Sequence, residues 1–331
     1  MGGVLVEGRW QAQDVGKPDD SGHFKRVESS FRNWITPDGR SGPTGTDGFR
    51  AEADRYHLYV SWACPWAHRT LILRALKQLE SLVPVSVVHW KMGDQGWTFL
   101  KSDGATGDPV NHCNALYELY VRARPDYSGH ATVPVLWDKR RGTIVNNESA
   151  DILRMFNSAF DGLGARPGDF YPAAKRKEID DVNARVYDTV NNGVYKAGFA
   201  RTQAAYEQAV VALFDTLDWL EVRLRHSPFL VGDAITEADV RLFTTLLRFD
   251  AVYHGHFKCN LRRLIDYSAL WRYTRRLLAV PGVASTVNLF HIKHHYYGSH
   301  ASINPSGVVP LGPDLDYGVP LSGARISPAI S

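Results

Sequence analysis

The sequence predicts an α/β domain followed by an all-helical domain, and three observations support this prediction. Strand and helix patterns alternate between residues 56 and 157, strand patterns stop after that point, and 331 residues fit about two domains. A Cys-Pro step, Cys64-Pro65, lies where the first buried strand pattern passes into a helical pattern. We expect the first domain to be organised around this junction.

Composition and charge are those of an ordinary globular protein. Hydrophobic residues make up 44% of the chain, charged residues 22%, and the formal net charge is +3, so neither a nucleic-acid partner nor a membrane partner is indicated. We find no signal-peptide pattern and no apolar run of the roughly 18 residues that span a bilayer. Cys64, Cys113 and Cys259 lack the spacing of a disulfide framework, so we expect a cytoplasmic protein.

Residues 1–55 predict an extended N-terminal arm. They are rich in Gly, Asp, Ser and Pro, yet they contain aromatic residues that a disordered tail would not need. We therefore expect the arm to pack on the body of the protein. The aromatic residues are Trp10, Phe24, Phe31, Trp34 and Phe49.

Residues 56–157 carry the α/β pattern. A tight turn at residues 139–142 joins two of the strand patterns into a hairpin. The order βαβ, α, ββ, α is that of the thioredoxin fold, and Val133-Pro134 lies where that fold keeps a cis-proline. The expected elements are a strand at 56–60, a helix at 71–79, a strand at 84–90, a helix at 115–123, strands at 132–137 and 143–145, and a helix opened by Asn147-Glu148-Ser149.

Only helical patterns follow the Gly- and Pro-bearing linker at residues 157–172. Thr236 to Asp239 has the form of a capping box, and Pro281-Gly282 ends a helix. The resulting divisions are an arm at 1–55, a thioredoxin-like domain at 56–157, a helical domain at 158–298 and an extended tail at 299–331, which we expect to be an ordered cap. The expected helices are 173–190, 202–225, 237–252, 269–280 and 282–290.

Cys64 is the candidate nucleophile. At a helix start its sulfur would face unpaired backbone N–H groups and the positive end of the macrodipole. Such a position can lower the pKa of a cysteine from about 8.5 by a unit or more. Ala67 occupies the second position of a C-x-x-C redox motif, so no resolving thiol is adjacent. The thiol that completes a turnover must come from elsewhere; the alternative is a buried structural cysteine.

Six stretches carry a resemblance to a known family: Trp62 to Arg69, Gly104 to Pro109, Thr132 to Asp138, Asn147 to Ser149, His291 to His300, and Ile303 to Pro305. They resemble the Xi class of the cytosolic glutathione transferases, the glutathionyl-hydroquinone reductases, from about residue 31 to residue 313. The two C-terminal stretches separate the match from the omega class, which shares a Cys-Pro site. One departure is His130-Ala131, where the family pattern usually has an Arg that would help hold glutathione.

The resemblance implies a glutathione transferase architecture and a glutathione-dependent reductase. The Cys64 thiolate would attack the sulfur of a glutathionyl-hydroquinone, the hydroquinone would leave, and a mixed disulfide with glutathione would remain. A second glutathione would then release oxidised glutathione. Glutathione is thus a co-substrate, and the family forms homodimers.

The resemblance also implies the residues that hold glutathione. Ser149 and nearby helix N–H groups would receive the γ-glutamyl carboxylate, and Glu148 would accept from the ammonium; the alternative is a pair that only caps the helix. The backbone of Val133, before Pro134, would face the cysteinyl part; the alternative is a simple strand start. Trp97 would cover the glutathione or, alternatively, fill a gap in a loop.

Two tyrosines match residues that line the quinol pocket in the family. Tyr195 and Tyr296 could donate to a quinol oxygen on which charge develops; the alternative is a pair of core aromatic residues. The histidines at 291, 294, 295 and 300 lack a metal-site motif, so we expect no metal.

Two other functions stay open. An omega-like thiol transferase or dehydroascorbate reductase would use the same cysteine on other substrates. A non-catalytic binding module would need neither Cys64 nor the Glu148-Ser149 pair.

Overall fold

The computed structural model describes residues 2–12 and 22–323, and the chain divides into two compact units. The first unit contains residues 2–12 and 28–168, and the second contains residues 22–27 and 169–323. The parts of the predicted arm and tail at residues 1, 13–21 and 324–331 lie outside the described residues.

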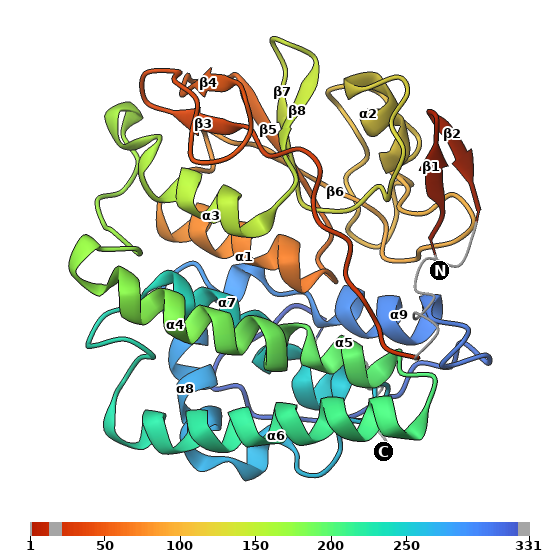
Figure 1. Ribbon diagram of the computed structural model, residues 1–331, viewed down its shortest axis with the longest axis vertical. Helices are drawn as coiled ribbons and strands as arrows, with labels where there is room; N and C mark the ends of the chain where they lie inside the picture. Colours follow the sequence, from red (N-terminus) through yellow and green to blue (C-terminus); the bar gives the residue numbers. More distant parts are fainter. Residues whose placement is uncertain (1, 13–21, 324–331) are drawn as a thin grey trace. The chain divides into compact units, whose positions relative to one another are not determined.

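A four-stranded mixed sheet forms the centre of the first unit, in the order β6-β5-β7-β8 (Figure 1). β5 (Tyr56–Val60) is fully buried and pairs in parallel with β6 (Val85–Val87) and antiparallel with β7 (Val135–Asp138). The edge strand β8 (Thr143–Asn146) is antiparallel to β7. The predicted βαβ unit, the hairpin and the thioredoxin-like order are confirmed.

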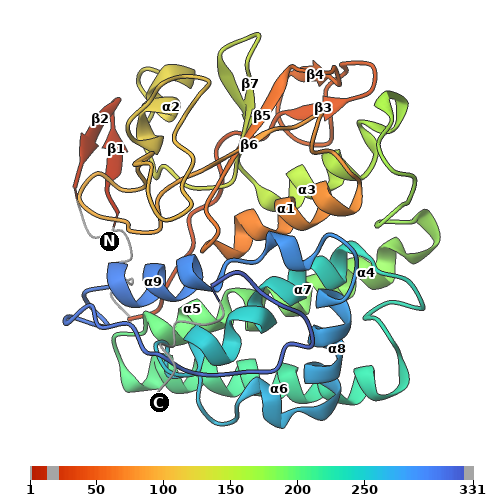
Figure 2. The ribbon, with the colours of Figure 1, turned by 180° about the vertical axis from the view of Figure 1, so that it is seen from behind.

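Helices cover this sheet as the pattern of apolar residues predicts. α1 (Pro65–Leu76) begins with a proline at its first position, where the missing N–H costs nothing. α1 and α3 (Ser149–Ser158) lie side by side in both views (Figures 1 and 2), while α2 (Leu116–Ala123) contacts β8. The starts of α1 and α3 place Cys64 and Glu148 as N-cap residues.

Four short strands add to the first unit without having been predicted. β1 (Val4–Val6) and β2 (Arg9–Gln11) form a hairpin whose turn, Glu7-Gly8, has positive φ at both residues. A Cβ at Gly8 would lie 1.9 Å from the carbonyl oxygen of Pro125, so this position requires glycine. β3 (Trp34–Thr36) and β4 (Gly48–Arg50) form a parallel pair.

The second unit is helical, as predicted, with α6 (Gln203–His226) alongside α5 (Gly193–Gly198) and α8 (Ser268–Leu278) (Figure 1). Two helices continue into π-helical turns, at Tyr187–Asn191 and Phe249–Tyr253. The predicted capping box at the start of α7 is confirmed, because the Asp239 carboxylate accepts from the Thr236 backbone N–H at 2.8 Å. The helices are α4 (Arg176–Val186), α5 (Gly193–Gly198), α6 (Gln203–His226), α7 (Glu237–Arg248), α8 (Ser268–Leu278) and α9 (Leu289–Ser299).

The prediction of a helix at residues 282–290 is wrong. A 3-10 turn occupies Ala284–Thr286, and α9 begins only at Leu289. The Asn288 side chain accepts from the backbone N–H of His291 at 3.0 Å, which satisfies an otherwise unpaired N–H group at the start of α9.

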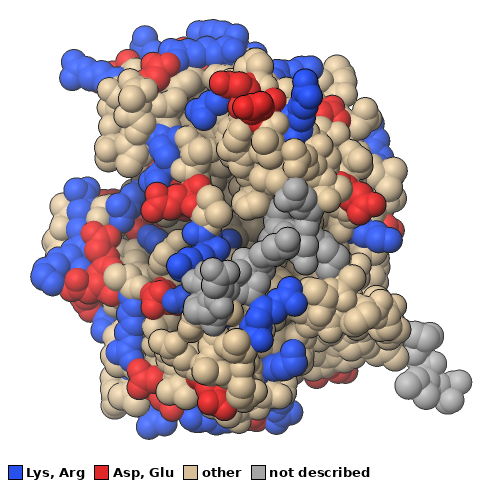
Figure 3. Space-filling view, turned by 45° about the vertical axis from the view of Figure 1, so that its right-hand side comes forward, with Lys and Arg blue, Asp and Glu red and all other residues tan. Residues whose placement is uncertain are grey.

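On the face shown in Figure 3, basic and acidic side chains are interspersed, in keeping with the small net charge. Within the described ranges, no helix has the length and apolarity that a membrane crossing requires.

Candidate active site

Cys64 lies at the junction of β5 and α1, where the sequence predicts it. It is the N-cap of α1, and its Sγ atom accepts from the backbone N–H of Ala67 at 3.5 Å. The side chain is half-buried. A sulfur in this position receives an N–H group that would stabilise a thiolate.

The other two cysteines are unsuited to thiolate chemistry. Cys113 and Cys259 are buried, and none of the three cysteines forms a disulfide. Burial raises the pKa of the Cys113 thiol to about 12 and also raises the pKa of Cys259 far above its ordinary value. Both stay protonated at neutral pH, so Cys64 remains the candidate nucleophile.

The Val133-Pro134 peptide bond is cis, as the sequence predicts. The Val133 carbonyl oxygen lies 3.5 Å from the Sγ atom of Cys64, so the loop before β7 and the start of α1 meet at this sulfur. Val133 itself is buried. The structure thus brings Val133 and Cys64 together.

Glu148 and Ser149 form the start of α3. Glu148 is the N-cap residue, and its Oε1 atom accepts from the backbone N–H of Ala150 at 3.0 Å. Ser149 is buried and receives a hydrogen bond from the Arg69 guanidinium at 3.4 Å. Arg69 lies on α1, the helix that Cys64 caps. The two helix starts are therefore connected, and each is a position that favours an anion.

Arg69 is a residue to which the sequence analysis assigns no role. It is buried, and its guanidinium lies 4.4 Å from the ring centroid of Trp66. A buried cation beside Ser149 adds positive charge where a carboxylate would bind. The sequence signal was a charged residue inside the apolar face of a helix.

Trp97 and His130 lie in loops of the first unit. Trp97 is buried, and its carbonyl accepts from the backbone N–H of Leu116 at 2.9 Å. His130, which stands where the family pattern has an Arg, is half-buried; in the described part of the chain its Nδ1 atom has no hydrogen-bond partner.

Tyr195 and Tyr296 lie together in the second unit, on α5 and α9. Their hydroxyl oxygens are 2.5 Å apart, and Tyr296 is also 3.0 Å from the hydroxyl of Tyr253, which the sequence analysis missed. Burial raises the pKa of Tyr253 and Tyr296 well above 10. Because Tyr195 is half-buried, this chain of hydroxyls ends at a more accessible group.

Residues 22–27, which belong to the second unit, contribute two side chains beside Tyr195. The Arg26 guanidinium lies 4.9 Å from the Tyr195 ring centroid and donates to the Asn192 side chain at 2.7 Å. Phe24 stacks on the same ring at 6.2 Å. A cation over the face of a phenol favours negative charge on that ring.

The predicted site residues fall into two groups. Cys64, Val133, Glu148 and Ser149 belong to the first unit, and Tyr195 and Tyr296 belong to the second. Among the residues that the structure describes, no group of three or more His, Cys, Asp or Glu side chains is placed to hold a metal ion.

Two family models match the chain. Residues 63–159 match the glutathione S-transferase N-terminal domain, and residues 203–276 match the glutathione S-transferase C-terminal domain.

Curated relatives match over nearly the full length. The chain is 55% identical to glutathionyl-hydroquinone reductase YqjG of Escherichia coli, with 95% of this chain and 97% of the relative covered. It is 54% identical to glutathionyl-hydroquinone reductase PcpF of Sphingobium chlorophenolicum, with 94% and 96% covered.

Solved structures match equally well. The glutathione-bound structure of Escherichia coli YqjG superposes with a TM-score of 0.89 at 53% identity, covering 96% of this chain and 98% of that one. The Xi glutathione S-transferase of Phanerochaete chrysosporium gives 0.86 at 52% identity, covering 92% and 97%.

Proposed function

Because this chain belongs to the Xi class of the glutathione transferases, we propose that it is a glutathionyl-hydroquinone reductase with glutathione as its co-substrate. The observation that carries the proposal is Cys64, a half-buried cysteine that caps α1. The position of a second cysteine in a C-x-x-C motif is occupied by Ala67. A one-cysteine site needs an external thiol to complete each turnover.

In the first step, the Cys64 thiolate attacks the glutathionyl sulfur of the conjugate. A sulfur–sulfur bond forms and the carbon–sulfur bond to the ring breaks. The electron pair of that bond stays on the ring carbon, which takes up a proton and becomes the hydroquinone. The Ala67 N–H, 3.5 Å from the sulfur, stabilises the thiolate before the attack.

In the second step, a glutathione thiolate attacks the mixed disulfide on Cys64. Oxidised glutathione leaves, and the electron pair of the disulfide returns to Cys64 as a thiolate. The two steps together convert one conjugate and one glutathione into one hydroquinone and one oxidised glutathione, because the proton lost from the glutathione thiol balances the proton taken up at the ring carbon.

The remaining predicted residues bind and orient the substrates. Ser149 and the N–H groups at the start of α3 would hold the γ-glutamyl carboxylate, with Arg69 beside them, and Glu148 would accept from the ammonium. Val133 would hold the cysteinyl part of glutathione next to Cys64, and Trp97 would cover it.

The hydroxyl chain of the second unit would act on the quinol. Tyr195 would donate to a quinol oxygen, and Tyr296 and Tyr253 would orient the Tyr195 hydroxyl. Donation at that oxygen stabilises the charge that develops as the carbon–sulfur bond breaks.

The proposal extends to the organisation and location of the protein. The thioredoxin-like domain at 56–157 would hold glutathione, the helical domain at 158–298 would hold the quinol, and the arm and tail would flank them. The chain would form homodimers without a metal. It would work in the cytoplasm, where glutathione is kept reduced. Light scattering of the purified protein should give twice the 37.0 kDa chain mass.

A substrate comparison tests the proposed activity. Purified protein is incubated with glutathione and, separately, a glutathionyl-hydroquinone, dehydroascorbate or a mixed disulfide of glutathione. We expect release of the hydroquinone and of oxidised glutathione. Reduction of dehydroascorbate or the mixed disulfide without hydroquinone release would favour the omega-like activity. Glutathione binding with no turnover of any substrate would favour a binding module.

A further inference from the structure

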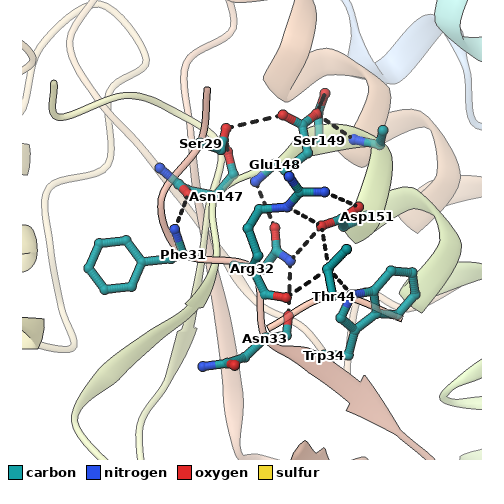
Figure 4. Close-up of polar contacts among 12 residues, drawn as sticks. Ser29, Phe31, Arg32, Asn33, Trp34, Thr44, Asn147, Glu148, Ser149 and Asp151 are labelled. Carbon is teal, nitrogen blue, oxygen red and sulfur yellow. Dashed lines mark hydrogen bonds and ion pairs between the residues drawn. The ribbon is translucent and has the colours of Figure 1, made fainter. Parts of the chain in front are cut away.

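Residues 29–44 run beside β8, the strand that leads to Glu148, and pair with the end of that strand. Arg32 pairs with Asn146 in an isolated antiparallel bridge. Two backbone hydrogen bonds, each 3.1 Å long, flank this bridge: Asn33 N–H to the Val145 carbonyl and Asn147 N–H to the Phe31 carbonyl. Residues more than a hundred positions apart thus meet at the turn before α3 (Figure 4).

Side chains of the segment fix the backbone of this turn. The Arg32 guanidinium donates twice to the Asp151 carboxylate, at 2.6 and 3.1 Å, and this hydrogen bonding raises the pKa of Arg32. Asp151 also accepts from the Asn146 side chain at 3.1 Å, and the Asn147 side chain accepts from the Phe31 N–H at 3.1 Å. Because Asn146, Asn147 and Asp151 are buried, these hydrogen bonds leave the turn little freedom.

Ser29 contacts the Glu148 carboxylate itself. Its Oγ atom lies 3.1 Å from Oε2 of Glu148 and 3.3 Å from the Asn147 carbonyl oxygen. The other carboxylate oxygen, Oε1, accepts from the Ala150 N–H at 3.0 Å. Each oxygen of Glu148 therefore has its own donor, and the plane of the carboxylate is held from both sides (Figure 4).

A carboxylate held in this way keeps acceptor capacity for a further donor. Two oxygens offer about four lone-pair positions. Hydrogen bonds from Ser29, from the Ala150 N–H and, at 3.4 Å, from the Ser149 hydroxyl use three of them, so one remains for an ammonium N–H. An ammonium group that approaches Glu148 would meet a carboxylate whose orientation is already set, and this lowers the entropy cost of binding.

We propose that Ser29 is a positioning residue for the binding of glutathione. Its hydroxyl holds the Glu148 carboxylate in the orientation that accepts from the γ-glutamyl ammonium. This inference rests on the proposed role of Glu148 in glutathione binding. Ser29 acts only through Glu148, so its removal weakens the recognition of the ammonium and leaves the chemistry at Cys64 unchanged.

Steady-state kinetics of Ser29→Ala test the proposal. We expect the KM for glutathione to rise about fivefold to tenfold, the effect of losing one ordinary hydrogen bond, with kcat within twofold of the parent. With N-acetylglutathione, whose ammonium is blocked, variant and parent should have the same KM. Ser29→Thr, which keeps the hydroxyl, should restore the KM for glutathione.

Ser30→Ala is the matched control. Its hydroxyl donates to the Tyr127 hydroxyl at 3.0 Å, so this variant changes the same segment through a different partner. Its KM for glutathione should stay at the parent value. A rise equal to that of Ser29→Ala would show that any loosening of the segment has the same effect, and would overturn the proposal.

Glu148→Gln separates failure of this inference from failure of the proposed site. If Glu148→Gln raises the KM for glutathione and adding Ser29→Ala raises it no further, the two residues act as one unit and the proposal holds. If Glu148→Gln raises the KM while Ser29→Ala alone does not, the positioning role is wrong and the role of Glu148 stands. If neither variant changes the KM, Glu148 does not bind glutathione and both proposals fail. An equal rise for N-acetylglutathione in Ser29→Ala would overturn the positioning role.

Discussion

At the scale of single residues, local environment separates three chemically identical thiols. Cys64 caps a helix and is half-buried, whereas Cys113 and Cys259 are buried. Desolvation disfavours their thiolates, and the pKa of Cys113 rises to about 12. The reactivity of a cysteine in this chain is therefore set by where the fold places its sulfur.

Alkylation of the native protein should accordingly be confined to one site. Iodoacetamide near pH 7.5 should modify Cys64 and leave Cys113 and Cys259 unmodified, because the form of cysteine that reacts with iodoacetamide is the thiolate. Peptide mass spectrometry reads the result, and the protein unfolded in denaturant, where all three cysteines should react, is the control. Modification of Cys113 as fast as Cys64 would contradict this assignment.

The Tyr195 hydroxyl gives a second prediction at this scale. Tyr195→Phe should lower kcat with a glutathionyl-hydroquinone by about a hundredfold, since it removes one donor to a developing negative charge. Tyr206→Phe is the control, because the Tyr206 hydroxyl donates at 2.7 Å to the Lys258 carbonyl outside the hydroxyl chain. An unchanged kcat in Tyr195→Phe would remove this residue from the mechanism.

At the scale of elements, β5 carries a buried histidine that links stability to pH. Nε2 of His57 lies 2.8 Å from the Ser86 hydroxyl on β6, and burial lowers the pKa of His57 from 6.5 to about 4. The unfolded chain therefore takes up a proton at this residue before the folded protein does. The contribution of His57 to the unfolding free energy is therefore largest above pH 6.5 and is lost as the pH falls towards 4.

His57→Gln should reduce that loss. Between pH 7 and pH 5 the parent should lose about 2 kcal/mol more unfolding free energy than the variant, the linkage expected for this pKa difference. Urea unfolding at the two pH values measures it. Between pH 7 and pH 8, where His57 is mostly neutral in both states, the difference between parent and variant should change by only about a tenth as much. Equal losses at pH 5 would mean that His57 does not titrate as described.

Elements with strong local signals were predictable from the sequence. β5 has the predicted bounds, and the α7 capping box is present. The weak signals failed: β1 and β2 are three residues each, too short to show alternation, and their turn carries Glu7 where Asn, Asp or Gly is usual. At residues 282–290 the apolar pattern suggested a helix, but Asn288 caps a helix that starts later.

The same distinction applies to the candidate site. Cys64-Pro65 is a local motif whose chemistry follows from two adjacent residues, whereas the roles of Val133-Pro134 and Glu148-Ser149 were predicted from the resemblance to a known family. The Arg69–Ser149 and Ser29–Glu148 contacts join residues 80 and 119 positions apart. No periodicity or spacing reports such pairs, because only the packing of α1 and α3 and the edge pairing along β8 bring them together.

At the scale of the whole molecule, the two units have different proposed roles in the reaction. In the proposed reaction the first unit would supply the thiolate and hold glutathione, and the second would supply the tyrosines for the quinol. Cleavage of the carbon–sulfur bond would need both, whereas attack of glutathione on the mixed disulfide would need only the first unit.

Separate measurement of the two half-reactions checks this division. Tyr195→Phe should slow the formation of the mixed disulfide from a glutathionyl-hydroquinone. The variant should reduce a preformed mixed disulfide on Cys64 with glutathione at the same rate as the parent. Rapid quenching and mass spectrometry follow both half-reactions. Equal slowing of both half-reactions would place the tyrosine effect elsewhere.

A single-turnover experiment tests the central claim most directly. Reduced protein is mixed with a glutathionyl-hydroquinone in the absence of glutathione, and intact-protein mass and released hydroquinone are measured together. We expect one glutathionyl group on Cys64 and one equivalent of hydroquinone per chain, and neither in Cys64→Ser. Release of hydroquinone while Cys64 remains unmodified, or an adduct on another residue, would contradict the claim that Cys64 is the nucleophile.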